Sequence, residues 1–561
     1  MTMNTSGSSS SNFDESHDYL IIGGGSAACA LAGRLSEDPA LTVAVLEAGG
    51  TGDSWVVNTP TAGVFMIPTK LNNWAFETVP QPGLNGRRGY QPRGKTLGGS
   101  SALNAMVYIR GDRSDYDHWA ALGNTGWSFE DVLPFFIKSE CNDSFGAPLH
   151  GTSGPLKVSR LRTDNPFQQR WLDAARESGH PINADFNGES QEGVGLYQVT
   201  QHEGERWSAA RGYLRPHMSP HPNARQNLCV KTHAQVLRIL FEGKRAVGVE
   251  LRQDGQVKRL QARCEVILSA GALQSPQLLM LSGIGDAAAL QTLGIPVVQH
   301  LPGVGANLQD HPDFTFGYLT DSLDAVGISL KGGARTLREI GRYRRERRGM
   351  ITSNFAEGGG FLKTRPEMSA PNVQLHFVVA LVKNHARDLG IGHGLSCHVC
   401  LLRPKSRGSV KLASREAGAV PLIDPGFLQD PDDVRQLIEG FRITRALMRA
   451  PSMKAHWTHE VWGSNASTDA EIETLLRQRV DTVYHPVGSC KMGVDEMAVV
   501  DPQLRVHGML GLRVVDASIM PTLIGGNTNA PAMMIGEKAA QMIRAGRLAQ
   551  PAATLPEAIP A

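Results

Sequence analysis

A glycine-rich loop near the amino terminus constrains the fold of this chain more than any other feature. The strand-like run 18–22 (DYLII) leads directly into the loop 23–28 (GGGSAA), and residues that favour a helix continue to Leu35. A second strand-like run, 42–46 (TVAVL), is followed by Glu47. This order predicts a β-strand, a helix and a parallel strand, with a phosphate-binding loop between the first strand and the helix. The pattern therefore predicts dinucleotide binding, and on its own it does not separate FAD from NAD.

Each residue of this fingerprint has a physical role. Gly23 permits the tight turn, and Gly25 lets the backbone approach the pyrophosphate. The backbone amides of Ser26 and Ala27, at the start of the helix, face the negative phosphates. Glu47 stands where an acidic side chain accepts a hydrogen bond from the adenosine ribose.

Bulk properties exclude several classes of protein. The 561 residues are too many for one compact core and enough for two joined domains. A net charge of +2 gives no reason to expect a nucleic acid partner. No apolar run approaches the ~18 residues that a membrane-spanning helix needs, and the Ser-rich residues 2–12 do not resemble a secretory signal. Seven scattered cysteines fit a reducing compartment, so we expect a cytoplasmic protein with a disordered leader over residues 1–16.

Cys397 and Cys400 form the one cysteine pair with metal-like spacing. A zinc site needs a second pair at a suitable distance, and none follows in the sequence. Residues 395–402 also have the composition of an apolar strand. We therefore expect no metal.

Glycine clusters and charged helical runs alternate along the chain and indicate a discontinuous organisation. Glycines concentrate where strand-like runs pass into loops, which is where a backbone can approach a ligand closely. We expect a cofactor domain interrupted by a substrate domain. The cofactor domain is expected over residues 17–160, 205–315 and 481–545, the substrate domain over 161–204 and 316–480, and a tail over 546–561.

Two longer motifs resemble those of a known family. Residues 94–104 (GKTLGGSSALN) are similar to the first signature of the glucose–methanol–choline (GMC) oxidoreductases, and residues 271–285 (GALQSPQLLMLSGIG) are similar to the second. Residues 302–311 and 485–538 also resemble family stretches. The resemblance covers roughly residues 17 to 545.

The resemblance implies an α/β fold. Its cofactor domain would be a discontinuous, Rossmann-like FAD-binding domain of the glutathione-reductase-like type, and its inserted domain would combine an antiparallel sheet with helices. It implies FAD as the cofactor. Beyond the fingerprint, the residues it places against FAD are Leu97, Gly98, Ser101, Asn104, Ala105, Met106, Val107, Val236, Ala270, Gly271, Asp516, Ala517, Asn527 and Thr528.

Two of these positions need comment. Some family members attach FAD covalently through a histidine, and this chain has Leu103 at that position, so we expect a non-covalent flavin. Asp516 also suits an ordinary turn or helix cap, and that alternative stays open.

The resemblance further implies alcohol oxidation, in which the hydroxyl loses a proton and flavin N5 receives a hydride. Imidazole titrates near neutrality and suits the base. His485, in YHPVGS, matches the active-site histidine of the family and is expected to take the proton. Asn529, in GNTNAP, is expected to donate to the alkoxide. For His311, beside Asp310, we expect only a structural hydrogen bond.

The substrate is less constrained. Glu357 aligns with a glutamate that meets the trimethylammonium group in choline-oxidising relatives, and Tyr484, Trp55 and Trp74 are candidate pocket aromatics for such a cation. The sequence around His485 resembles that of aliphatic-alcohol and polyethylene-glycol dehydrogenases more than that of choline dehydrogenases. We expect a primary aliphatic alcohol. A choline dehydrogenase and an O₂-using alcohol oxidase remain alternatives, as do a flavin-binding protein without turnover and a lyase or photoenzyme.

The electron acceptor is expected to be a quinone or a similar carrier. The predicted helix within 330–350 carries seven arginines. Such a cluster can meet anionic lipid, although a solvated face is the more common explanation. Peripheral attachment to the inner membrane is therefore left open.

Overall fold

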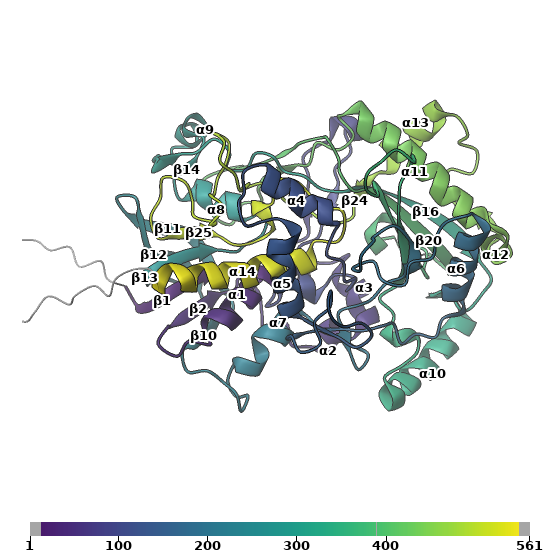
Figure 1. Cartoon of the computed structure of the whole chain (residues 1–561), viewed down its shortest axis with the longest axis horizontal. Helices are drawn as coiled ribbons and strands as arrows, with labels where there is room; N and C mark the ends of the chain where they lie inside the picture. The colour runs from purple at the N-terminus through teal and green to yellow at the C-terminus, as the bar shows by residue number, and fades with distance from the viewer. Residues whose placement is uncertain (1–12, 389, 549–561) are drawn as a thin grey trace, which may run out of the picture.

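Two β-sheets at opposite ends of an elongated molecule organise the fold (Figure 1). The structure, a computed structural model, describes residues 13–388 and 390–548. The first sheet has the strand order β10-β2-β1-β13-β12-β11, and β25 pairs with the end of β13. Its strands are β1 (Glu15–Ile22), β2 (Val43–Leu46), β10 (Leu228–Lys231), β11 (Ala234–Glu242), β12 (Arg245–Gln253), β13 (Gln256–Leu268) and β25 (Leu512–Val514).

The centre of the parallel part of this sheet is buried on both faces. β2 has the sequence VAVL, with every residue buried, as is typical of parallel strands that helices cover. Helix α1 (Ser26–Leu35) follows β1 and packs against α14 (Asn529–Leu548), the last helix of the described chain (Figure 1). The strand, loop and helix predicted from the fingerprint are thus present, and they bring the two ends of the chain together.

The second sheet is antiparallel throughout and has the order β23-β16-β20-β19-β18-β7. In β16 the side chains of Phe314, Phe316 and Tyr318 alternate onto one face and enter one core with α11 (Pro431–Arg449). The strands are β7 (Gly193–Leu196), β16 (Pro312–Thr320), β17 (Gly327–Ile328), β18 (Ala356–Leu362), β19 (Val373–Val378), β20 (Gly392–Leu401), β23 (His459–Glu460) and β24 (Asp481–Thr482).

Shorter elements complete the two halves. The remaining helices are α2 (Trp55–Asn58), α3 (Gly63–Met66), α4 (Arg113–Ala121), α5 (Phe129–Ser139), α6 (Pro166–Glu177), α7 (Ala209–Tyr213), α8 (Ser275–Leu281), α9 (Ala287–Thr292), α10 (Leu330–Glu346), α12 (Pro451–Lys454) and α13 (Asp469–Arg479). Two-stranded pairs are β3 (Phe76–Glu77) with β4 (Tyr90–Gln91), β5 (Glu140–Asn142) with β6 (Leu156–Val158), β8 (Gln201–His202) with β9 (Glu205–Arg206), β14 (Ile284–Gly285) with β15 (Gln299–His300), and β21 (Ser409–Lys411) with β22 (Leu422–Asp424).

The predicted fold class is confirmed, since a mainly parallel sheet with helices stands beside an antiparallel sheet with helices. The predicted leader is too long, because β1 begins at Glu15 and pairs with β13 from that residue onward. Residues 1–12 lie outside the described residues, as does the predicted tail after Leu548. The division into domains stays a prediction, although β16 and β24 place residues 312–320 and 481–482 in the second sheet.

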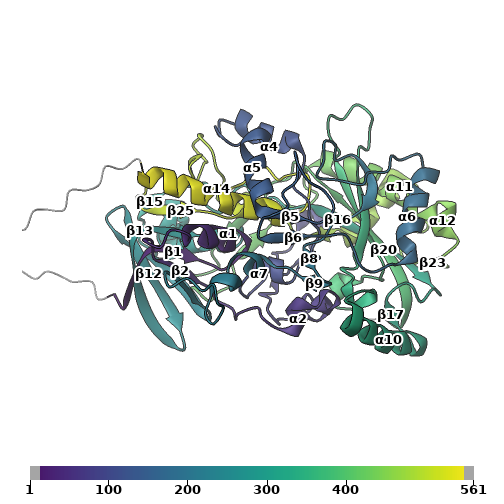
Figure 2. The ribbon, with the colours of Figure 1, turned by 60° about the horizontal axis from the view of Figure 1, so that its bottom comes forward.

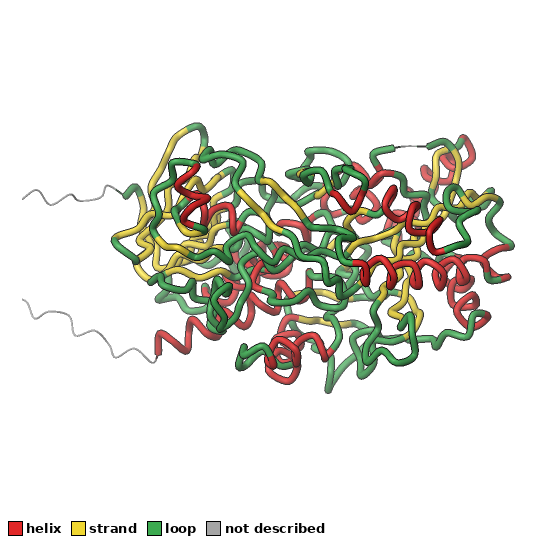
Figure 3. Tube along the Cα trace, turned by 90° about the horizontal axis from the view of Figure 1, so that it is seen from above, coloured by secondary structure: helices red, strands yellow, loops and turns green. Residues whose placement is uncertain are grey.

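The middle of the molecule consists largely of loops, which Figure 3 shows in green between the strands of the two ends. Loops positioned by a rigid scaffold are where functional residues concentrate. In the described part of the chain, no helix combines the length and the hydrophobicity that crossing a bilayer requires.

Candidate active site

A cavity of about 820 Å³ extends from the carboxyl ends of β1 and β2 to the edge of the second sheet. Its volume is in the range of cofactor and ligand sites. Ile22 and Leu46, the last residues of the two parallel strands, line one end. Ala356 and Val378, from β18 and β19, line the other. The first is called the nucleotide end below, and the second the substrate end.

The glycine loop is shaped to leave room at the nucleotide end. Gly23 has a φ of +96°, and a Cβ there would lie 2.6 Å from the carbonyl oxygen of Ser269, so only glycine fits. A Cβ on Gly25 would meet nothing closer than that oxygen at 3.8 Å. Glu47 is buried and accepts hydrogen bonds from the backbone of Gly24 at 2.8 Å and Gly49 at 2.7 Å. Burial raises the pKa of the Glu47 carboxyl.

Most of the residues predicted to contact the cofactor line this cavity. They are Gly23, Gly25, Ser26, Ala27, Glu47, Asn104, Ala105, Met106, Val107, Val236, Ala270, Gly271, Asp516, Ala517, Asn527 and Thr528.

Three predicted contact residues lie one layer behind the lining. The amide of Gly98 donates to the carbonyl of Gly24 at 2.7 Å. The hydroxyl of Ser101 accepts from the amide of Ala209 at 2.9 Å, and Leu97 is buried. The structure therefore gives Leu97, Gly98 and Ser101 a supporting position behind the lining, and their contact with the cofactor stays a prediction.

Asp516 combines the two roles considered for it. Its carboxylate accepts from the amide of Ser518 at 2.8 Å, which caps the short turn that follows. It also accepts from the amide of Gly271 at 2.8 Å and the hydroxyl of Ser275 at 2.5 Å. Since Asp516 lines the cavity as well, it ties the two loops that close the nucleotide end.

At the substrate end, a chain of hydrogen bonds assigns the tautomer of His485. Nε2 of His311 lies 3.0 Å from the carbonyl oxygen of Leu402 and 3.1 Å from that of Ile524. Because carbonyls only accept, His311 carries its proton on Nε2. Its Nδ1 is then an acceptor, and it lies 3.0 Å from Nδ1 of His485. His485 is therefore the donor at Nδ1 and keeps an unprotonated Nε2.

The other side of His485 gives the same assignment. Nδ2 of Asn527 lies 3.1 Å from Nε2 of His485. The Asn527 amide is oriented by Gln374, whose Nε2 donates to Asn527 Oδ1 at 2.9 Å. An amide nitrogen only donates, so Nε2 of His485 is an acceptor. Two independent sets of contacts thus leave the lone pair of His485 Nε2 on the side of Asn527 and the cavity.

The predicted pairing of His485 with Asn529 needs correction. Asn529 is the first residue of α14, and its Oδ1 accepts from the hydroxyl of Ser26 at 2.7 Å. That contact places Asn529 at the nucleotide end, against the start of α1. Asn527 precedes the helix, and its side chain is the one that meets His485.

The dipeptide Asp310-His311 holds His485 at two points. Asp310 Oδ1 accepts from the backbone amide of His485 at 2.9 Å, while His311 contacts its ring. Burial raises the pKa of Asp310 to about 6. The structural hydrogen bond expected of His311 is present, since its backbone amide donates to Asp310. Its contact with His485 adds a positioning role.

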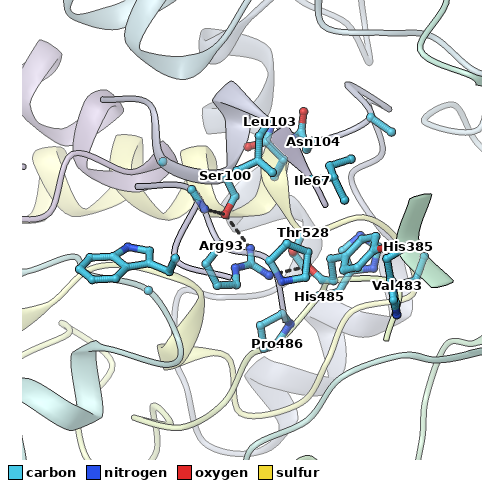
Figure 4. A pocket seen from close by; sticks show the side chains of 18 of the residues that line it. Ile67, Arg93, Ser100, Leu103, Asn104, His385, Val483, His485, Pro486 and Thr528 are labelled. Atoms are coloured by element: carbon cyan, nitrogen blue, oxygen red, sulfur yellow. Dashed lines mark hydrogen bonds between the residues drawn. The ribbon is translucent and has the colours of Figure 1, made fainter. Parts of the chain in front are cut away.

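His485 is neutral in this environment. Burial, followed by the nearby His311, His376 and Arg93, holds the pKa of His485 well below its ordinary value of 6.5. Arg93 donates to the carbonyl of Tyr484 at 2.8 Å and to the hydroxyl of Ser100 at 2.9 Å. Figure 4 shows Arg93 beside Ser100 and His485. Burial lowers the pKa of Arg93 to about 10, so it remains a cation at neutral pH.

Comparison with known proteins identifies the family of this chain. The amino- and carboxy-terminal family models described as GMC oxidoreductase match residues 17–313 and 404–536. The chain is 46% identical to an alcohol dehydrogenase [acceptor] of Pseudomonas putida, over 94% of this chain and 95% of the relative. The chain belongs to the GMC oxidoreductase family.

Further relatives support the same family. The mitochondrial choline dehydrogenase of Homo sapiens is 42% identical, over 96% of this chain and 91% of the relative. The crystal structure of pyridoxine 4-oxidase from Mesorbium loti superposes with a TM-score of 0.84 at 30% identity, covering 94% of this chain and 99% of that one. The protein is thus an FAD-dependent enzyme of the GMC type.

The residues at the nucleotide end fit FAD. Gly271 has a φ of +84°, and a Cβ there would meet nothing within 4 Å, which leaves space for a ligand. The free amides at the start of α1 suit a pyrophosphate, and Glu47 keeps acceptor capacity for a ribose hydroxyl. Leu103, which also lines the cavity, carries no nucleophile.

Glu357 does not reach the main cavity of this GMC enzyme. Its carboxylate accepts from the hydroxyl of Ser353 at 2.6 Å, that of Thr163 at 3.0 Å and the amide of Gln168 at 2.8 Å. It is fully buried and lies in a separate small pocket. The structure therefore contradicts its predicted contact with substrate, because the side chain is turned away from the cavity and its oxygens are engaged.

Of the three aromatic residues predicted to line the pocket, two do so. Tyr484 and Trp74 line the cavity. Trp55 does not, since its side chain is exposed on the surface. The hydroxyl of Tyr484 contacts Nδ1 of His385 at 2.5 Å.

His376 is the residue that sequence reasoning missed. It is buried on β19 and lines the cavity, yet neither ring nitrogen has a hydrogen-bond partner in the described part of the chain. Burial lowers its pKa to about 3. The signal was present in the strand VQLHFV, where Gln374 and His376 alternate onto the face that meets Asn527.

Backbone strain also gathers around the substrate end. Met106, Phe355 and Tyr484 have φ values of +59°, +66° and +75° and all line the cavity. Non-glycine residues avoid this region of φ unless the surrounding structure holds them there. The strain marks this part of the loop structure as fixed in shape.

No cluster of three potential metal ligands occurs in residues 13–388 and 390–548. Cys397 and Cys400 are buried on β20, three positions apart, and therefore point to opposite faces of the sheet. They belong to different hydrophobic cores, so this pair does not converge on one site.

Proposed function

We propose that this GMC oxidoreductase oxidises a neutral primary alcohol to the aldehyde, with non-covalently bound FAD and a quinone-like acceptor. The observation that carries the proposal is the unprotonated Nε2 of His485, held beside the amide of Asn527 in the cavity wall. A base and a hydrogen-bond donor that converge on one point are what removal of a hydroxyl proton requires.

Each residue around the substrate hydroxyl then has its own role in the reaction. His485 Nε2 takes the hydroxyl proton, and Asn527 Nδ2 donates to the alkoxide oxygen. The substrate hydroxyl replaces the direct 3.1 Å contact between these two side chains. His311 accepts from Nδ1 of His485 and keeps the ring in the tautomer that leaves Nε2 free. Bound FAD supplies the acceptor for the hydride that leaves the carbinol carbon.

FAD would be held by the glycine loop, Glu47 and the loops around Gly271 and Asp516. Leu103 supports non-covalent binding, because a leucine cannot form a bond to the flavin. Neither ring nitrogen of His376 has a partner among the described residues, so this side chain would hydrogen bond a group of the substrate or the cofactor.

The preference for a neutral alcohol rests on the cavity wall. Around Tyr484 and His485 the lining is largely apolar, with Ile67, Val378, Ala380, Val382 and Val483 among its members. The carboxylates among the described lining residues are Glu47 and Asp516 at the nucleotide end and Asp388, which is exposed. Glu357 is engaged elsewhere, so none of the described lining residues places a carboxylate beside His485 for a quaternary ammonium.

A quinone-like acceptor is favoured by the relative from Pseudomonas putida, whose name specifies an acceptor. That protein is similar along nearly its whole length. The alternative is an oxidase that uses O₂. Comparing the rate at which the reduced flavin is reoxidised by air with the rate for a soluble quinone distinguishes the two.

The test is anaerobic mixing of the flavin-loaded protein with 1-octanol and with choline in separate experiments, followed by flavin absorbance. The proposal expects rapid bleaching by 1-octanol and little by choline. Bleaching by choline alone would overturn the neutral-alcohol assignment in favour of a choline dehydrogenase. A fully loaded flavin that neither alcohol bleaches would overturn the substrate class.

A further inference from the structure

Large apolar side chains are exposed in one area at the outer opening of the cavity. Leu330 is 98% exposed and Ile391 is 93% exposed. The area, called the mouth surface below, consists of Trp55, Phe65, Ile328, Leu330, Leu337 and Ile391. Soluble proteins seldom gather exposed residues of this size without a partner.

The cavity itself opens at the mouth surface. Phe65, Ile328 and Ile391 are exposed and also line the cavity. Trp55 packs edge-on against Phe65, with ring centroids 6.4 Å apart. Figures 1 and 2 both show α2 and α10 along the same edge of the molecule. A route from solvent to His485 therefore begins between apolar side chains.

Helix α10 contributes an apolar stripe with a basic border. Glu339 and Tyr343 are buried on its inner face. On its outer face Leu330, Ala334 and Leu337 follow one another at helical spacing. Basic residues at intervals of seven run beside this stripe, and they are Lys331, Arg338 and Arg345.

The charge of this segment far exceeds that of the whole chain. Residues 330–348 hold eight basic and two acidic side chains, while the entire chain has a net charge of +2. Some of the arginines are neutralised, for example Arg335 by Asp324 and Arg342 by Asp164. Among the described residues, no acidic side chain lies within 4.0 Å of Lys331, Arg338 or Arg344. The outer face of α10 thus keeps unneutralised positive charge.

We propose that the mouth surface docks on an anionic phospholipid bilayer, with α10 lying in the interface and the cavity opening toward the lipid. An apolar stripe bordered by Lys and Arg is the composition of helices that bind at the surface of anionic membranes. The apolar residues come from α2, α3, β17, α10 and the segment before β20. A surface assembled from so many segments suits the deformable interior of a lipid bilayer.

The docking also explains how a poorly soluble alcohol reaches His485, since the substrate would pass from the bilayer into the opening. That explanation rests on the proposed function, whereas the docking does not. An experiment without turnover therefore tests the docking separately.

The test is flotation of the full-length, flavin-loaded protein with vesicles of phosphatidylcholine alone or of phosphatidylcholine with phosphatidylglycerol. We expect flotation with the anionic vesicles, at least about tenfold more than with the neutral ones, and its loss at high salt. The double variants L330D/L337D and R338E/R344E should each lose at least about tenfold of the binding. Both replace exposed side chains that lie outside the cavity lining, so flavin content and reduction by a short soluble alcohol should stay at the parent level.

Matched controls are available on the hairpin β12–β13, at the opposite end of the molecule (Figure 1). Val257 is 55% exposed, and Arg252 is exposed as well. V257D and R252E should float like the parent. Absence of flotation, or flotation that the mouth-surface variants leave unchanged, would overturn the proposal. A different outcome in sedimentation experiments is that the parent is a dimer and that L330D/L337D is a monomer. That result would overturn the proposal, because the mouth surface would then bind a second copy of the chain.

Discussion

The two ends of the cavity differ in whether their buried polar groups have hydrogen-bond partners within the protein. At the nucleotide end the protein satisfies its own carboxylates, since Glu47 accepts from two backbone amides and Asp516 from two amides and a hydroxyl. At the substrate end, both ring nitrogens of His376, which lines the cavity, have no partner in the described residues. Buried polar groups without partners are costly. The first end is therefore built as a rigid frame, and the second keeps hydrogen-bonding capacity for a ligand.

The sharpest test of this difference is the removal of the base. His485→Ala should lower the rate of flavin reduction by alcohol by about 10²–10⁴-fold, because general-base catalysis contributes that much. Flavin content should stay near that of the parent, since His485 belongs to the substrate end. Stopped-flow absorbance measures the first and the protein-to-flavin ratio the second. His300→Ala, at an exposed position, is the matched control. Equal loss of flavin and of rate would contradict the separation of the two ends.

Two asparagines two residues apart allow each end to be tested alone. Asn527→Ala should slow flavin reduction by roughly 10–100-fold, because the loss of one donor to a developing oxyanion has costs of this order or larger. Asn529→Ala removes the acceptor for Ser26 at the start of α1. It should weaken FAD binding by up to about tenfold, as expected for one hydrogen bond, and change the reduction rate of the loaded enzyme little. Titration of the apoprotein with FAD, together with stopped-flow reduction, distinguishes the two. Reversed effects would restore the pairing first inferred from sequence.

The pH dependence of reduction tests the role of His311. Because the pKa of His485 is lowered, its neutral, basic form persists below the ordinary value of 6.5. The reduction rate of the parent should therefore not fall between pH 7.5 and pH 6.5. His311→Leu removes one cause of the lowered pKa and the acceptor for Nδ1–H. We expect the acidic limb to move to higher pH and the plateau rate to drop by about tenfold.

A purely structural role for His311 would give a different result. The rate would then change through loss of folded protein, with the acidic limb in the same place. His311→Gln is the informative companion, because its amide can restore a contact with His485 and should recover part of the rate. Thermal unfolding of both variants monitors the fold.

The nucleotide end was largely predictable because its chemistry is contiguous in sequence. Residues 18–47 specify a strand, a turn that only glycine allows and a helix start, and local steric rules decide each step. The acidic residue at the end of the second strand then follows from the parallel pairing of β1 and β2. The other contacts at this end join distant segments, such as that of Asp516 with Gly271 and that of Asn529 with Ser26, and local rules do not supply them.

The substrate end depends on contacts that local rules do not supply. Asn527 and Asn529 differ by two residues, and which of them meets His485 depends on where α14 begins. His376 stands in an apolar strand, and only the pairing of β19 in the second sheet directs it toward Asn527. Glu357 shares a motif with relatives, yet the position of Thr163 and Gln168 turns it away from the cavity.

The smallest expected effect belongs to Glu357, and it is informative for that reason. Glu357→Gln keeps the shape of the side chain, and its amide oxygen can still accept from Thr163 and Gln168. The Ser353 hydroxyl can turn to accept from the new amide, as hydroxyls both donate and accept. Removal of a buried carboxyl with a raised pKa also relieves part of the cost of burying charge.

We therefore expect E357Q to fold like the parent and to give KM values for 1-octanol and for choline within about threefold of it. Glu357→Leu, which cannot accept from any of the three donors, should lower the thermal unfolding temperature while leaving the preference between the two alcohols unchanged. A selective rise of the choline KM in E357Q would mean that the carboxylate reaches the substrate. Glu357 would then supply the charge that the wall around His485 lacks, and the substrate end would be a cation site after all.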